Sequence, residues 1–135
     1  MILAVIDTNV VVAALMSKHR DSATRRTLMA IADGRVQPII TADILAEYED
    51  VLHRDYLRLS ADEADRTIEL FERTGRTLNP VPADEEFPDE DDRVFYEVAL
   101  AGAVDNAKVV TGNLKHYPKS PMVLTPTEFC QLIGV

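Results

Sequence analysis

Ile2-Leu3-Ala4-Val5-Ile6-Asp7-Thr8-Asn9 joins an apolar run to a carboxylate and to two residues able to cap a helix. The run, residues 2–6, has the length and the β-branched content of a fully buried strand. In open parallel α/β sheets, ligands bind beyond the carboxyl ends of the strands. Asp7 stands at such an end, so this stretch predicts a buried parallel strand with a functional carboxylate beside it.

The size and composition of the chain predict one domain, residues 1–135, with a substantial core. No apolar run approaches the ~18 residues of a membrane span, and Asp7 would interrupt the apolar core of a signal peptide. The single cysteine, Cys130, cannot form an internal disulfide and is expected to pack in the last helix. We therefore expect a cytoplasmic protein without a membrane segment.

The acidity of the chain is concentrated in one segment. Residues 84–92 carry seven of its acids and no base, and without those seven charges the net charge of −9 becomes −2. A global negative field that would exclude nucleic acid is therefore not predicted. Four arginines could still form a basic surface, although scattered arginines are more often simply solvated: Arg25, Arg26, Arg54 and Arg58.

Apolar periodicity and capping residues predict strands that alternate with helices. The predicted strands are residues 2–6, 36–40, 77–81, 108–111 and 122–124, the third of them broken by Pro80 and Pro82. The predicted helices are residues 9–16, 22–33, 41–54, 60–75, 93–103 and a last one that begins at Thr125-Pro126. This alternation implies right-handed crossovers and a mostly parallel sheet covered on both faces, which is a three-layer α/β/α fold.

Several polar residues fall where that sheet would present its carboxyl edge. Asp7 ends the first strand, Thr111 and Asn113 end the fourth, and the acidic segment feeds a helix N-terminus. On helix 41–54, Glu47 and Glu49 each lie about 40° outside the apolar stripe, so helix geometry leaves both as candidates.

Each of these residues also has a purely structural interpretation. Asp7 could cap the following helix, Thr8 and Asn9 are typical turn and cap residues, and Glu47 could be a solvated helix acid. Most of the acidic segment is expected to be a solvated loop. His116 and Tyr117 are interpreted as surface packing residues rather than as substrate contacts.

Carboxylates that converge without counter-charges repel one another, which raises their pKa values. A hard divalent cation relieves that repulsion, and Mg²⁺ and Mn²⁺ prefer carboxylate, carbonyl and water ligands. Two such ions about 3.5–4 Å apart can activate a water and stabilise the leaving oxygen in phosphodiester hydrolysis. The side chain of Asn113 could add a neutral oxygen ligand.

Four segments in order resemble the PIN-domain nucleases, especially the bacterial and archaeal VapC-like toxins of toxin–antitoxin pairs. The resemblance covers nearly the whole chain and rests on Val5-Ile6-Asp7-Thr8-Asn9-Val10, Ile44-Leu45-Ala46-Glu47-Tyr48, Asp89-Glu90-Asp91-Asp92-Arg93-Val94-Phe95 and Val109-Val110-Thr111-Gly112-Asn113-Leu114-Lys115-His116.

This resemblance implies an α/β/α fold and a site for one or two Mg²⁺ or Mn²⁺ ions that cuts single-stranded RNA. It selects Glu47 over Glu49, and within the acidic segment it selects Asp92, with Asp89 in support. Asp7, Glu47 and Asp92 would bind metal, and Asn113 would complete the catalytic set. Thr8, Asn9 and Thr111 would support it. A homodimer and an antitoxin protein partner are further implications of the resemblance.

Two other functions compete with this prediction. Many family members carry Asp where this chain has Asn113, so a PIN-like binding or regulatory module with little catalysis is one alternative. The other is a phosphatase that uses Asp7 as a nucleophile, as in haloacid dehalogenase-like enzymes. Those enzymes usually have a second Asp two residues later, where this chain has Asn9, and no glycine-rich phosphate loop is present.

Overall fold

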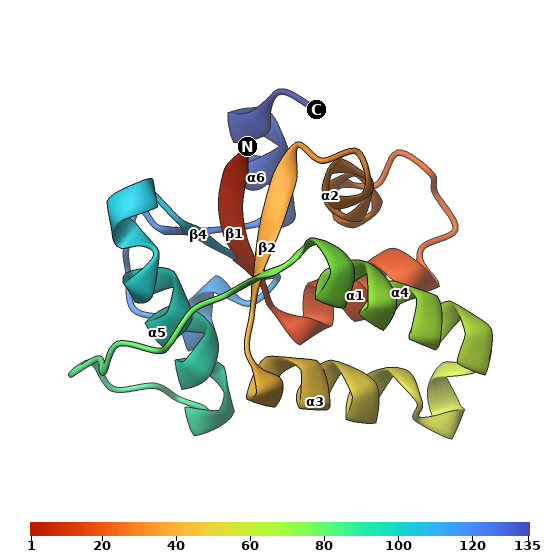
Figure 1. Cartoon of the computed structure of the whole chain (residues 1–135), viewed down its shortest axis with the longest axis horizontal. Helices are drawn as coiled ribbons and strands as arrows, with labels where there is room; N and C mark the ends of the chain where they lie inside the picture. The colour runs from red at the N-terminus through yellow and green to blue at the C-terminus, as the bar shows by residue number, and fades with distance from the viewer.

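A five-stranded parallel sheet runs through the middle of the molecule, whose computed structural model describes all residues from 1 to 135 (Figure 1). Its strands are β1 (Ile2–Ile6), β2 (Val36–Ile40), β3 (Arg76–Thr77), β4 (Lys108–Val110) and β5 (Val123–Leu124). They lie in the order β3-β2-β1-β4-β5, and every neighbouring pair is parallel. The first strand of the sequence is therefore the central strand of the sheet.

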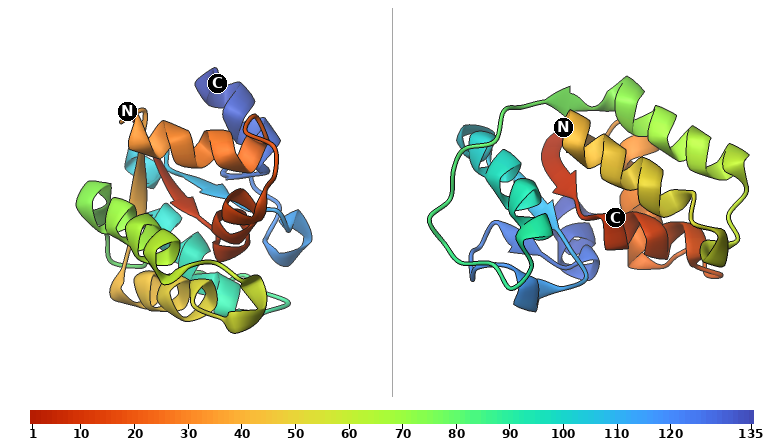
Figure 2. Two further views of the ribbon diagram at one scale, coloured as in Figure 1. Left: turned by 90° about the vertical axis from the view of Figure 1, so that its right-hand side faces the viewer. Right: turned by 90° about the horizontal axis from the view of Figure 1, so that it is seen from below.

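Six α-helices surround the sheet: α1 (Thr8–Met16), α2 (Ala23–Ala32), α3 (Ala42–Leu52), α4 (Ala61–Thr74), α5 (Arg93–Ala101) and α6 (Pro126–Ile133). Figure 2 shows α2 and α6 on one side of the sheet and α3, α4 and α5 on the other. The predicted three-layer α/β/α architecture is confirmed. Short 3₁₀ helices cover Asp55–Leu57, Glu90–Asp92, Ala103–Asp105 and Leu114–His116.

One hydrophobic cluster of 28 buried residues fills the space between the layers. Strand β1 contributes a nearly continuous buried run, as expected for a parallel strand covered on both faces. Cys130 is buried in α6, as predicted, and its thiol donates to the carbonyl of Ala23. No helix is long and apolar enough to cross a membrane.

Several helix boundaries follow the sequence signals. The Thr125 hydroxyl accepts from the Glu128 amide at 3.1 Å while the Glu128 carboxylate accepts from the Thr125 amide at 2.9 Å, a reciprocal cap at the start of α6. Gly75 ends α4, but its φ of −73° is not left-handed. Glycine is needed there because a Cβ would lie 2.4 Å from the carbonyl oxygen of Phe71.

The predicted strand at residues 77–81 is wrong beyond its first residue. The pairing of β3 stops at Thr77, and the amide of Val81 donates to the carbonyl of Glu97 on α5 instead of to a strand. Pro80 and Pro82 have no amide hydrogen to contribute to a ladder. The segment after β3 therefore crosses over α5 as an extended chain.

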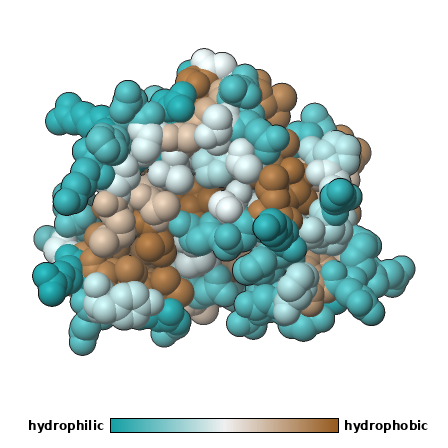
Figure 3. Space-filling view, turned by 180° about the vertical axis from the view of Figure 1, so that it is seen from behind, coloured by the Kyte–Doolittle hydropathy of each residue, from teal (hydrophilic) through white to brown (hydrophobic).

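The exposed hydrophobic residues lie in several separate patches on the surface of the molecule. On the face in Figure 3, hydrophobic side chains gather in patches divided by hydrophilic ones. Large exposed hydrophobic residues over the whole molecule include Met16, Met29 and Leu114. No single apolar face dominates the view.

Candidate metal centre

Asp7 lies at the carboxyl edge of the two central strands. Ile6 pairs with Val110, and the amide of Asp7 donates to the carbonyl of Val110 at 2.9 Å, so Asp7 and Thr111 follow side by side. Asp7 is buried, with only 4% of its surface exposed. Its backbone caps α1, but its side chain makes no capping hydrogen bond. Helix capping therefore does not account for this carboxylate.

One oxygen of Asp7 receives three hydrogen bonds. Its Oδ2 accepts from the hydroxyl of Thr111 at 2.8 Å, the hydroxyl of Tyr117 at 3.0 Å and the side-chain NH₂ group of Asn9 at 3.4 Å. Burial raises the pKa of Asp7, although the hydrogen bonds from Thr111 and Tyr117 lower it in part. The three side-chain donors fix the carboxylate, and hydrogen bonding from the backbone of Asn9 and Thr8 also lowers its pKa.

Glu47 reaches the same edge from α3. The hydroxyl of Thr8 donates to its Oε2. Burial raises the pKa of Glu47 against the effect of that hydrogen bond, and the negative charges of Asp7, Asp91 and Asp89 raise it further. Three other acids therefore lie close enough to Glu47 to act on its charge.

Glu49 points away from this group and lies 3.8 Å from the ring of His53. Between the two glutamates, the hydroxyl of the fully buried Tyr48 donates to the carbonyl of Ile6, which ties α3 to the end of β1. The structure thus separates the two acids that helix geometry left open.

Asp92 approaches Asp7 from the start of α5. Its Oδ2 is buried and has no hydrogen-bond partner, although the Nδ1 of His116 lies 3.2 Å away, in ion-pairing range when the imidazole is protonated. Burial, followed by the charges of Asp7 and Asp89, raises the pKa of Asp92 to about 6, and His116 offsets only part of this rise. A buried carboxylate oxygen is costly without a counter-charge, which a protonated His116 or a bound cation would supply.

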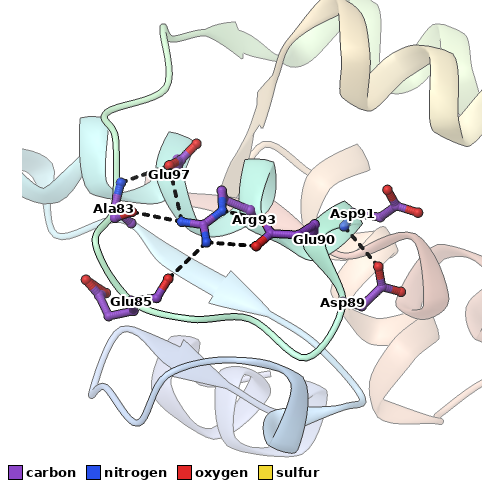
Figure 4. Close-up of polar contacts among 7 residues, drawn as sticks. All are labelled: Ala83, Glu85, Asp89, Glu90, Asp91, Arg93 and Glu97. Atoms are coloured by element: carbon purple, nitrogen blue, oxygen red, sulfur yellow. Dashed lines mark hydrogen bonds and ion pairs between the residues drawn. The ribbon is translucent and has the colours of Figure 1, made fainter.

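The acidic segment is held in place by Arg93 (Figure 4). The guanidinium donates to the carbonyls of Ala83 at 2.8 Å and Glu85 at 3.0 Å, and it pairs with Glu90 at 2.6 Å. It also lies 4.6 Å from the centre of the Phe87 ring, over its face. One cation therefore fixes the loop that leads into Asp92.

The remaining predicted residues occupy the rim of the site. The Asp89 carboxylate accepts from the amide of Asp91 at 3.0 Å, and in Figure 4 both lie away from the Arg93 cluster. The side chain of Asn9 accepts from the amide of Gly112 at 3.2 Å, which joins the turns after β1 and β4.

Asn113 lies at the mouth of the site and is exposed. Its backbone amide donates to the hydroxyl of Thr111 at 3.0 Å. No hydrogen bond joins its side chain to Asp7, Glu47 or Asp92. The structure brings Asn113 to this edge of the sheet without engaging its amide group.

Sequence reasoning missed three residues of this site. Tyr117 is buried and donates to Asp7, so its interpretation as a surface packing residue is wrong; His116 is at the surface, as predicted, but it also lies against Asp92. Arg93 received no role. The available signal was position: His116 and Tyr117 follow shortly after the strand that ends at Thr111, and Arg93 is the only base adjoining seven acids.

The donor set fits a hard divalent cation. Asp7, Glu47 and Asp92 supply carboxylate oxygens, burial raises the pKa of each, and the buried Oδ2 of Asp92 makes no hydrogen bond beyond its ion pair with His116. Oxygen donors of this kind are the ones that Mg²⁺ and Mn²⁺ prefer.

A second group of potential ligands lies on the surface, between α3 and α4. One atom each from Glu49, His53 and Asp65 lies within 4.8 Å of the others. All three are exposed, and the ring of His53 already contacts the carbonyl of Glu49 at 2.8 Å and Asp65 at 3.0 Å. This group lacks the burial and the unpartnered oxygen of the edge site.

Carboxylates gathered at the carboxyl edge of a parallel α/β sheet are the arrangement of a metal-dependent enzyme that acts on phosphate esters. The sequence matches the family model of the PIN domain over residues 3–115, so the chain belongs to the PIN domain family. PIN domains are in general nucleases, which places this protein with the metal-dependent hydrolases of nucleic acids. A search of curated proteins found no match to the sequence.

The raised pKa values predict how stability depends on pH in a cation-free buffer. Between pH 4 and about 6 the folded protein holds a proton on Asp92 that the unfolded chain has released. The free energy of unfolding should therefore fall as pH rises through this window, by an amount on the order of 1 kcal/mol after allowance for solvent screening. Asp7 and Glu47 act in the same direction.

Urea unfolding at a series of pH values measures this slope. Asp92→Asn should reduce this slope, and saturating Mg²⁺ should remove or reverse it, because a cation bound to the ionised carboxylates stabilises the folded state more as pH rises. Asp105→Asn, which removes the same charge from an exposed ion pair with Arg76, should keep it. An unchanged slope in Asp92→Asn would contradict the electrostatic account of the site.

Proposed function

We propose that this protein is a metal-dependent endoribonuclease that hydrolyses phosphodiester bonds of single-stranded RNA with one or two Mg²⁺ or Mn²⁺ ions. The observations that carry the proposal are that the charge of Asp7 acts on both Glu47 and Asp92, and that the Oδ2 of Asp92 is buried without a hydrogen bond. The PIN family supplies the nuclease class. The choice of RNA rests on the resemblance to the toxin-like members.

Some side chains of the site would bind a cation, and others hold those ligands in position. Asp7 through Oδ1, Glu47 and Asp92 would hold the ion. When bound, such an ion neutralises charge on the phosphate and lowers the pKa of an attacking water.

The surrounding residues fix these ligands. Thr8 orients Glu47 through its hydroxyl, and Thr111 and Tyr117 orient Asp7. Asp89 adds negative charge at the rim, where it acts on both Glu47 and Asp92. The exposed amide of Asn113 offers a neutral oxygen toward a ligand or substrate at the mouth. The side chain of Asn9 accepts a hydrogen bond from the amide of Gly112 and so stabilises the turn that carries Asn113.

The test is cleavage of end-labelled single-stranded RNA during a Mn²⁺ titration, with DNA of the same sequence in parallel. Asp92→Asn and Glu47→Gln should each lower the cleavage rate at least about 100-fold, because each removes a charged ligand of the ion. Calorimetry should show weaker Mn²⁺ binding in both variants. Asp105→Asn serves as the control and should keep both properties.

The results separate the possible outcomes. Metal-dependent cleavage of RNA but not DNA, lost in the two site variants, supports the ribonuclease. Equal cleavage of DNA would overturn the RNA assignment. No cleavage of any RNA while Mn²⁺ still binds would favour the second candidate, a binding or regulatory module.

Asn113 is the observation that favours this second candidate, because a neutral amide brings one charge fewer to the site than a carboxylate would. Asn113→Asp tests it: the added charge should tighten Mn²⁺ binding several-fold. If cleavage rises in step, Asn113 tunes an active enzyme. If no cleavage appears despite tighter binding, the module is favoured.

The toxin role, an antitoxin protein partner and a homodimer extend the same proposal and rest on the family resemblance. Induced expression should arrest growth, Asp92→Asn should not, and co-expression of a small neighbouring reading frame should relieve the arrest. Light scattering during gel filtration should give twice the chain mass of 15.0 kDa. Growth without arrest would contradict the toxin role.

A further inference from the structure

A hollow of about 550 Å³ lies beside the carboxylates, on the segment that follows β4. Tyr117 forms part of its lining, and the hydroxyl of this tyrosine donates to Asp7 at 3.0 Å. The neighbouring His116 lies against Asp92. The hollow is thus separated from the candidate metal centre by one side chain.

The charge of this hollow is opposite to that of the chain. Lys115 and Lys119, two of the four lysines in the sequence, line it, and none of its lining residues is acidic. Neither lysine forms an ion pair with the protein. In a chain of net charge −9, two free ammonium groups beside a candidate nuclease site favour the binding of an anion. The phosphate backbone of a nucleic-acid substrate is such an anion.

Part of the lining of the hollow is apolar, and we call this part its floor. Leu114, Tyr117, Pro118 and Val123 line it, and Leu114 leaves 42% of its surface exposed at the rim. The Tyr117 ring is fixed by its hydroxyl and by an edge-to-face contact with Phe87, 6.2 Å between centres. Tyr117 and Val123 are only 6% and 8% exposed, so Leu114 and Pro118 offer most of the apolar surface for the face of an unpaired base.

Lys115 also connects the hollow to the mouth of the site. With Leu114 it lines a second hollow of about 440 Å³ that includes Gly112, Asn113 and His116. The two hollows therefore share Leu114 and Lys115 of the 3₁₀ helix Leu114–His116.

We propose that the Lys115–Lys119 hollow binds the nucleotide next to the scissile phosphate, with its base on the apolar floor and its phosphate between the two lysines. This inference rests on the proposed function, because it assigns a subsite for the same single-stranded RNA. Unpaired bases are free to enter such a hollow, whereas bases of a duplex are stacked and paired.

The test measures binding directly in an Asp92→Asn background, so that cleavage does not intervene. Fluorescence anisotropy with a labelled single-stranded RNA octamer gives Kd at several salt concentrations. Lys115→Gln/Lys119→Gln should weaken binding about tenfold and reduce the slope of log K against log salt by about 1, as expected for lost phosphate contacts.

The matched control is Lys18→Gln/Lys108→Gln, which removes the same charge from lysines outside the hollow. It should keep both the affinity and the slope. Leu114→Ala should weaken octamer binding about fivefold without changing the salt slope, because it removes base contact and leaves the charge intact.

Equal losses in the two lysine pairs would overturn the subsite, since they would reflect net charge alone. Unchanged affinity in the Lys115/Lys119 variant would also overturn it and leave the hollow to a protein partner. The proposed function can be overturned independently of the subsite. If the unmodified protein cuts no RNA but the Lys115/Lys119 variant still binds RNA more weakly, the subsite is supported and the nuclease activity is not.

Discussion

Asp7→Asn is expected to abolish RNA cleavage and, in the absence of a cation, to make the protein more stable. The amide oxygen of Asn replaces Oδ2 and still accepts from Thr111 and Tyr117. Its NH₂ group then stands in the place of Oδ1, where it cannot bind a cation. Cleavage should fall at least about 100-fold because an essential charged ligand is lost.

The gain in stability has an electrostatic cause. Burial disfavours the charged form of Asp7, and its charge also raises the pKa values of Glu47 and Asp92. A neutral side chain removes both effects, which should raise the free energy of unfolding by about 1 kcal/mol and the Tm by about 3 °C. Calorimetric scans with EDTA measure it, and Asp105→Asn is the control.

Two results would contradict this account of Asp7. Retained cleavage would remove Asp7 from the site. A lower Tm in EDTA would show that the carboxylate stabilises the fold, as a structural residue does, rather than being held there against an electrostatic cost.

Arg93→Ala is expected to be the most destabilising substitution of a charged residue. The guanidinium satisfies two backbone carbonyls, pairs with Glu90 and covers Phe87. Only 26% of its side chain is exposed, so these contacts are partly shielded from water. Their loss should lower the urea concentration at the midpoint of unfolding, because two backbone carbonyls lose their hydrogen-bond donor.

Urea unfolding measures this effect, and Arg76→Ala provides a matched control. Arg76 makes one exposed ion pair, with Asp105 at 3.2 Å, so its loss should change stability by less than about 1 kcal/mol. Arg93→Ala should also expose the loop at residues 83–92 to limited proteolysis, because that loop loses its anchor. Equal effects of the two substitutions would show that Arg93 is an ordinary surface arginine.

The sequence predicted the parts of the fold that depend on local patterns. The run that ends at Ile6 reads as a buried strand because both faces of β1 are covered, and Thr125 with Glu128 forms the reciprocal cap that the spacing indicates. The prediction of a strand at residues 77–81 was wrong because strand propensity carries no information on which strand would pair with it. Its amide at Val81 found a helix carbonyl instead.

The position of a candidate site residue could be predicted from the sequence only where that residue directly follows a strand or begins a helix. Asp7 follows a strand, so its place at the sheet edge follows from the fold class. Glu47 and Glu49 could not be separated by helix periodicity, because the difference lies in long-range contacts: Glu47 meets Thr8, and Glu49 meets His53. Tyr117 carries no pattern at all, since its contact with Asp7 spans 110 positions.

An ion held by Asp7, Glu47 and Asp92 would make the lifetime of the folded protein depend on the concentration of that ion. An ion that binds only the folded chain, at 100 times its Kd, stabilises that chain by about 2.7 kcal/mol. Proteolysis of transiently opened molecules follows the population of the open form. The half-life of this protein toward a protease should therefore lengthen as the concentration of free divalent cation rises.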